Sequence, residues 1–110
     1  MAYDESLAGR IRDGLAGTIG IVEKKMFGGI GFLLAGNLCV GVWKDSLVVR
    51  LDADAGTAAL KETHVRPFDV TGRPMRGWIL VDPPGVAADK ALNKWVCRAV
   101  EFVRTLPAKP

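Results

Sequence analysis

The sequence predicts an α+β fold, a two-layer sandwich in which helices cover one face of an antiparallel sheet. Three observations lead to this class. A long amphipathic stretch closes the chain, a shorter one opens it, and the middle holds short apolar runs separated by turn residues. No repeat or linker divides the 110 residues, so we expect a single domain over residues 1–110.

The first element expected is a short helix. Asp4 is a good N-cap, and Leu7, Ile11 and Leu15 recur at the four-residue spacing of one helix face. Residues 21–27 then predict a strand with a charged centre. Its lysines indicate an edge position, since charged side chains blunt an exposed strand edge.

Two hairpins are expected next. Residues 30–35 and 38–43 flank Gly36-Asn37, a pair suited to a two-residue turn, and Lys44-Asp45 leads from there into residues 46–51. With both turns two residues long, the predicted opposite pairs are Phe32 with Gly41, Leu34 with Cys39, Val40 with Val49 and Cys39 with Arg50.

This register assigns each side chain to one of two faces, because neighbours along a strand point to opposite sides. An aliphatic face, which the helices should cover, holds Leu33, Leu38, Val40, Val42, Leu47, Val49 and Leu51. A mixed face, which we take as the candidate working surface, holds Phe32, Leu34, Cys39, Gly41, Trp43, Ser46, Val48 and Arg50.

The second half of the chain ends in its clearest element. Before it we expect a short helix capped by Asp54 and running through Glu62, an extended segment at 64–67, a short strand at 68–70, a turn at 71–74 and a strand at 77–81. The last helix shows one apolar stripe, made of Leu92, Trp95, Val96, Ala99, Phe102, Val103 and Leu106. We expect this stripe to share a core with Leu33, Val40, Val42 and Val49 of the sheet.

Composition and charge narrow the function classes. Fifteen Lys and Arg against twelve Asp and Glu leave a net charge of +3, a mild excess that does not favour direct nucleic-acid binding. The charged N-terminal segment lacks the apolar core of a signal peptide, which predicts a cytoplasmic protein. The uncharged stretch from Met26 to Trp43 approaches the length of a membrane span, but its glycines favour a buried hairpin and no membrane association.

No reaction centre can be assembled from sequence spacing. Gly29-Ile-Gly31 lacks the third glycine of a phosphate loop and is followed by a predicted strand, so we assign these glycines to close backbone packing. His64 near Asp69, and Cys97 on the polar side of the last helix, are the residues that an enzyme would have to use. With one histidine and two separated cysteines, we expect no metal site and no cofactor.

The segment from Arg66 to Arg76, termed here the arginine loop, offers a second type of site. Together with Arg50, its residues Arg66, Arg73 and Arg76 could hold a carboxylate or phosphate through bidentate contacts. An ion pair of Asp69 with one of these arginines is the alternative.

Ordered signatures in this sequence resemble those of one family. MFGGIGF (26–32), GNLCVGV (36–42), VVRL (48–51), RPFDVTGRPMRGWILV (66–81) and FVRTLPAK (102–109), with the opening MAYDESLAGRIR, resemble the N-terminal domain of the TfoX/Sxy family. The resemblance implies an α+β fold similar to the secretion-chaperone-like class, often dimeric. It also implies a link to competence regulation, in which full-length members act with the catabolite activator protein and carry a second, helical domain.

The leading hypothesis is therefore a non-enzymatic regulatory or protein-interaction domain that forms a homodimer, with a protein partner in transcription regulation as the further expectation. Phe32, Trp43 and Arg50 are the candidate interface residues, because the predicted register places them on the face that helices leave open. In the alternative, the arginine loop folds over that face within one chain. The second hypothesis is a module for a small anion or nucleotide, and the third is an enzyme.

Overall fold

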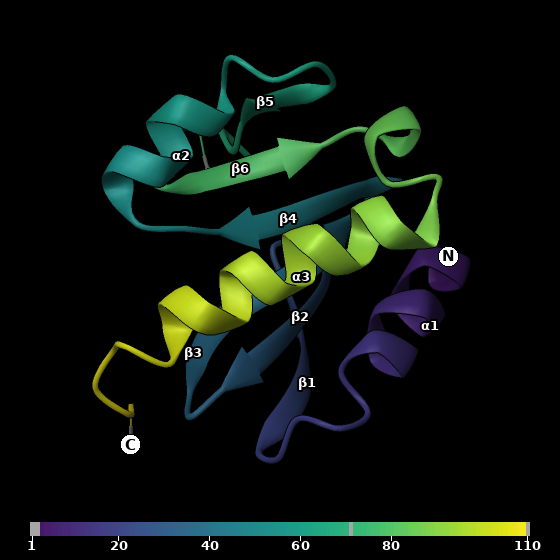
Figure 1. The fold of residues 1–110 in the computed structure, drawn as a ribbon, viewed down its shortest axis with the longest axis vertical. Helices are drawn as coiled ribbons and strands as arrows, with labels where there is room; N and C mark the ends of the chain where they lie inside the picture. The colour runs from purple at the N-terminus through teal and green to yellow at the C-terminus, as the bar shows by residue number, and fades with distance from the viewer. Residues whose placement is uncertain (1–2, 71, 110) are drawn as a thin grey trace.

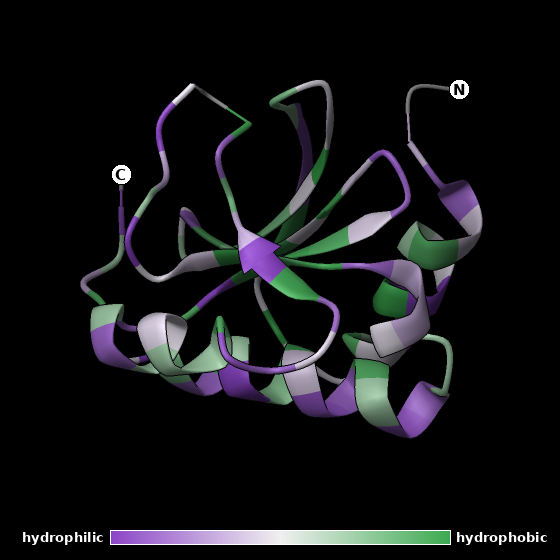
Figure 2. Ribbon diagram, turned by 90° about the horizontal axis from the view of Figure 1, so that it is seen from above, coloured by the Kyte–Doolittle hydropathy of each residue, from purple (hydrophilic) through white to green (hydrophobic). Residues whose placement is uncertain are grey.

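The computed structural model describes residues 3–70 and 72–109 and confirms the predicted two-layer α+β class. All strand pairs of the six-stranded sheet are antiparallel, in the order β1-β2-β3-β4-β6-β5. The helices form one layer on one face of this sheet (Figures 1 and 2). The elements are α1 (Glu5–Gly14), β1 (Ile21–Met26), β2 (Gly29–Leu34), β3 (Asn37–Trp43), β4 (Ser46–Arg50), α2 (Ala53–Ala59), β5 (Val65–Pro67), β6 (Trp78–Val81), a 3₁₀ turn (Pro83–Gly85) and α3 (Asp89–Val103).

The N-terminal elements follow the prediction. Asp4 caps α1 by accepting a hydrogen bond from the Leu7 N–H at 3.1 Å. Strand β1 is an edge strand of the sheet, as its lysines indicated. Arg12 of α1 donates two hydrogen bonds to the carboxylate of Glu23, at 2.7 and 2.6 Å, and so ties this edge to the helix layer.

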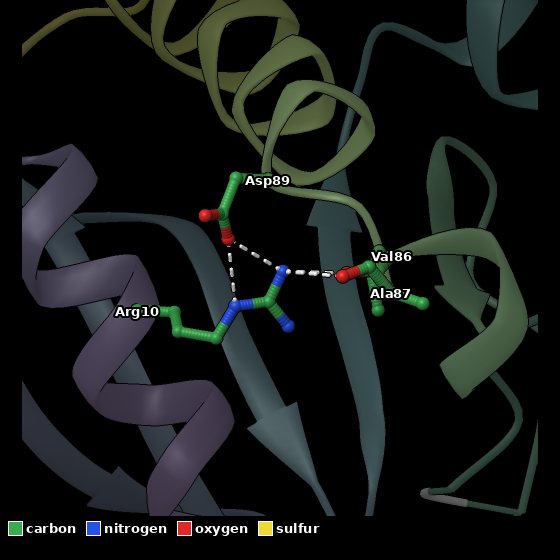
Figure 3. A network of polar contacts seen from close by, with 4 residues as sticks. All are labelled: Arg10, Val86, Ala87 and Asp89. Carbon is green, nitrogen blue, oxygen red and sulfur yellow. Dashed lines mark hydrogen bonds and ion pairs between the residues drawn. The ribbon is translucent and has the colours of Figure 1, made fainter.

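Arg10 joins α1 to the start of α3 (Figure 3). Its Nε and Nη2 donate to one carboxylate oxygen of Asp89, at 3.1 and 2.9 Å. Nη2 also donates to the carbonyl oxygens of Val86 at 2.8 Å and Ala87 at 3.2 Å. One arginine thereby orients two helices that are far apart in sequence.

The turn between β2 and β3 lies one residue earlier than predicted. Leu34 pairs with Asn37, so Ala35 and Gly36 form the turn, with φ values of 52° and 81°. Positive φ at both positions is what a tight hairpin turn requires. Asn37 is buried in the strand instead, and its amide donates to the Pro107 carbonyl at 2.9 Å.

A register shift corrects the predicted faces. Phe32 pairs with Val40 and Leu33 with Leu38, which leaves Cys39 as an extra residue in β3. The bulge interrupts the alternation of side chains. Phe32, Leu34 and Cys39 therefore join the core under the helices, and the predictions for Leu33 and Leu38 are wrong because both lie on the opposite face. Between β3 and β4, by contrast, the predicted pairing of Val40 with Val49 and the turn at Lys44-Asp45 are confirmed.

Two further elements differ from prediction. Asp52, not Asp54, caps α2, because its carboxylate accepts from the Ala55 N–H at 2.8 Å, and the helix ends at Ala59. The predicted strand at 68–70 is absent from the described part of the chain, since pairing with β6 ends at Pro67. Thr71, in the predicted turn, lies outside the described residues.

The main core lies between the sheet and the helices. Val40, Val42 and Val49 meet Trp95 and Val96 of α3 there, as expected, and Phe102 packs against this core while only partly buried.

Candidate interaction surface

A second apolar cluster covers the sheet face that points away from the helices, called here the second face. Four of its side chains are buried, namely Leu38, Val48, Phe68 and Leu80. Six more are partly buried, namely Met26, Phe27, Leu33, Trp43, Val70 and Trp78.

Two glycines create room on the second face for the turn between β1 and β2. Gly31 and Gly41 pair with each other across β2 and β3, and a Cβ at Gly41 would lie 2.5 Å from the Ile30 carbonyl oxygen and 3.1 Å from the Phe27 ring. A Cβ at Gly31 would lie 2.5 Å from the Met26 sulfur. Gly31 of the MFGGIGF signature and Gly41 of the GNLCVGV signature thus allow Met26 and Phe27 to fold onto bare backbone. The close backbone packing predicted for Gly29 and Gly31 is confirmed.

The beginning of the arginine loop, which follows the edge strand β5, covers the same face from the opposite edge of the sheet. Phe68 is 1% exposed, and its ring centroid lies 5.6 Å from that of Phe27, edge to face. It also lies 5.5 Å from the ring centroid of Trp78. For Phe68, the structure therefore shows the alternative arrangement, in which the arginine loop packs on this face within one chain.

This arrangement corrects the predicted interface set. Phe32 is fully buried on the helix side and has no surface to offer a second copy. Trp43 and Arg50 remain partly exposed. Arg50 lies over the Trp78 ring at 5.4 Å, and burial lowers the pKa of its guanidinium.

Arg66 is held in a polar cluster beside Trp43. Its Nε donates to Asp82 at 2.9 Å, and the buried Ser46 hydroxyl donates to the same carboxylate oxygen at 3.1 Å. The guanidinium also lies 5.9 Å from the Trp43 ring centroid, while Lys44 Nζ lies 4.7 Å from it. Partial burial alone would raise the pKa of Asp82, but the hydrogen bonds from Arg66 and Ser46 and the nearby positive charge hold it below the usual value.

This cluster predicts a pH-dependent contribution to stability. Because the pKa of Asp82 is depressed on folding, its contribution is present above 3.8, the ordinary value, and is lost as pH falls through the folded-state pKa. We expect Asp82→Asn to destabilise the protein at neutral pH and the difference from wild type to shrink below about pH 4. Urea denaturation across that range measures it. In an Arg66→Gln background the effect of Asp82→Asn is expected to shrink at neutral pH, and an undiminished effect would contradict the assignment.

The remaining arginines of the loop do not converge with the others on one ligand position. Arg73 is exposed, and Arg76 lies 3.6 Å from Asp54 of α2 in an exposed ion pair. Each of Arg50, Arg66 and Arg76 thus already has a different neighbour within the chain.

A small cavity opens beneath the arginine loop, where the loop meets α2. Its volume is about 220 Å³, and it is lined by α2, by Pro67 and by residues 74–79. The sequence pattern did not indicate this cavity, because it depends on the close approach of Gly56 to the Gly77 backbone, where a Cβ on Gly56 would lie 2.5 Å from the Gly77 Cα. Gly77 has a φ of 87°, a conformation that favours glycine, and this glycine is the feature of the sequence that indicates a tight approach.

The candidate catalytic residues lie on three separate segments. His64 and Asp69 are exposed on either side of β5, and Cys97 is exposed on α3, on the helix side of the sheet. Burial raises the pKa of the other thiol, Cys39, to about 12, which makes it a poor nucleophile. Within residues 3–70 and 72–109, no three His, Cys, Asp or Glu side chains gather as a metal ion would require. None of the helices there has the length and apolar character needed to cross a membrane.

The fold and the second face together define a class: a two-layer α+β domain whose open sheet face is closed in part by aromatic side chains from two loops. The family model of the TfoX N-terminal domain matches residues 13–103. The chain therefore belongs to the TfoX N-terminal domain family, as its signatures indicated. Comparisons with curated proteins and with solved structures gave no match.

Proposed function

We propose that this chain is a non-enzymatic interaction domain that acts in regulation and pairs with a second copy of itself through the second face. The observation that carries the proposal is the partial exposure of apolar side chains there. Trp43 and Leu33 are only partly buried, and Val22, which pairs with Leu33 at the β1 edge, is 61% exposed. A twofold partner would remove this apolar surface from water.

Membership of the TfoX N-terminal domain family supports a regulatory role. Competence and transcription regulation are the processes that the family resemblance implies, and a protein partner in transcription regulation follows from them. His64 and Asp69 lie on either side of β5 and Cys97 lies on α3, which favours a role that does not require these three residues to act together.

Sedimentation equilibrium tests the pairing. We expect wild type to form a dimer as its concentration rises, and Trp43→Glu to weaken that dimer because a charge would be buried in the interface. Val22→Glu keeps the test valid if Trp43→Glu fails to fold, since Val22 is already largely in water. Leu60→Glu is the matched control, because Leu60 is an exposed apolar residue directly after α2 that does not belong to the second face. A wild type that stays monomeric at high micromolar concentration would remove self-association.

A further inference from the structure

The cavity between α2 and the arginine loop has unpartnered apolar side chains on both of its walls. Leu60, directly after α2, is 39% exposed, and Met75 on the loop is 36% exposed. Among the described residues, the large exposed apolar side chains are Ile19, Val22, Leu60 and Met75, so half of them line this one cavity. Covering them would remove apolar surface from water, which favours binding of an apolar group.

The size of the cavity selects among occupants. Its volume is about 220 Å³. Sites that enclose drug-sized ligands and cofactors span about 300 to 1,000 Å³, so this cavity is smaller than a site that would enclose a whole nucleotide. One Leu or Phe side chain, presented by a peptide, is a matched occupant.

The positive charge at the cavity favours an occupant that carries a carboxylate. Arg76 is the one charged side chain among the residues that line it. Arg76 pairs with Asp54 at 3.6 Å, with the two side chains 74% and 96% exposed. Exposed pairs of this kind contribute little to stability, so an incoming carboxylate can replace Asp54.

We propose that this cavity binds a peptide segment of a partner protein that presents one large apolar side chain flanked by carboxylates. The apolar side chain lies between Leu60 and Met75, against Trp78, and a flanking carboxylate pairs with Arg76. The inference rests on the proposed interaction role and uses the cavity beside α2, which shares Trp78 with the second face but not Leu33, Trp43 or Val22, on which the proposed self-association depends. Loss of peptide binding and loss of self-association are therefore separate results.

The test is a titration of the whole chain with acetylated tetrapeptides, followed by amide NMR shifts and Trp78 indole signals. Glu-Leu-Phe-Glu is expected to bind with shifts at Leu60, Met75 and Arg76. Lys-Leu-Phe-Lys and Glu-Ser-Ser-Glu are expected to bind at least about tenfold more weakly, because the first reverses the charge and the second lacks the apolar group.

Two substitutions act in opposite directions. Arg76→Glu is expected to weaken binding of Glu-Leu-Phe-Glu about tenfold or more, since it reverses the pairing charge. Asp54→Ala is expected to strengthen it, because the competing carboxylate is gone. Neither residue is buried, so both variants are expected to fold. Equal binding of the acidic and basic peptides, shifts located elsewhere, or a weaker Asp54→Ala complex would each overturn the proposal.

Discussion

Phe68→Ala is expected to lower the free energy of unfolding by about 3 to 5 kcal/mol, the range found for removing a buried aromatic side chain. Phe68 is 1% exposed and contacts the rings of Phe27 and Trp78. It is also the residue through which the arginine loop is anchored on the second face. Urea denaturation at neutral pH measures the loss.

The control for Phe68→Ala is Val22→Ala, an apolar truncation on the same face at a residue 61% exposed. A change within about 0.5 kcal/mol is expected there, as for most surface substitutions. If Phe68→Ala cost less than about 1 kcal/mol, the ring would not be buried in solution and the loop would not cover the face.

Gly41→Ala is expected to destabilise by about 1 to 3 kcal/mol, although it adds a single methyl group. The added Cβ would lie 2.5 Å from the Ile30 carbonyl oxygen and 3.1 Å from the Phe27 ring. The ring can move, but the carbonyl belongs to the β2–β3 pairing and cannot retreat without disturbing the sheet. Thermal or urea denaturation checks the result, and loss of near-ultraviolet aromatic signal would report displacement of Phe27.

Gly9→Ala is the control for Gly41→Ala, because it is expected to stabilise the protein and not to destabilise it. Gly9 lies within α1, and a Cβ there would meet no atom within 4 Å. We expect a gain of about 0.5 to 1 kcal/mol, because alanine restricts the unfolded chain and favours helix. A Gly41→Ala variant as stable as Gly9→Ala would contradict the close packing on the second face.

The site was harder to predict than the elements, as Phe32 shows. Its place in a strand followed from the apolar run between turn residues, but its face depended on the register, and one extra residue at Cys39 moved it to the helix core. Of the predicted interface set, Trp43 and Arg50 lie partly exposed on the second face and Phe32 does not. The sequence did not show that Arg50, Arg66 and Arg76 each have a different neighbour within the chain, because those neighbours, Trp78, Asp82 and Asp54, are far from them in sequence.

Periodicity and turn chemistry were enough to establish the α+β class, the order of most elements, the cap at Asp4, the edge position of β1 and the stripe of α3. These features depend on residues within a few positions of one another, which the sequence displays directly. The side of the sheet on which Phe32 and Leu33 lie, the contact of Phe27 with Phe68 and the cavity beside Gly77 were decided by the tertiary structure. Their physical cause is long-range: a bulge reverses the alternation of side chains, and only the folded sheet brings distant loops onto the same bare backbone.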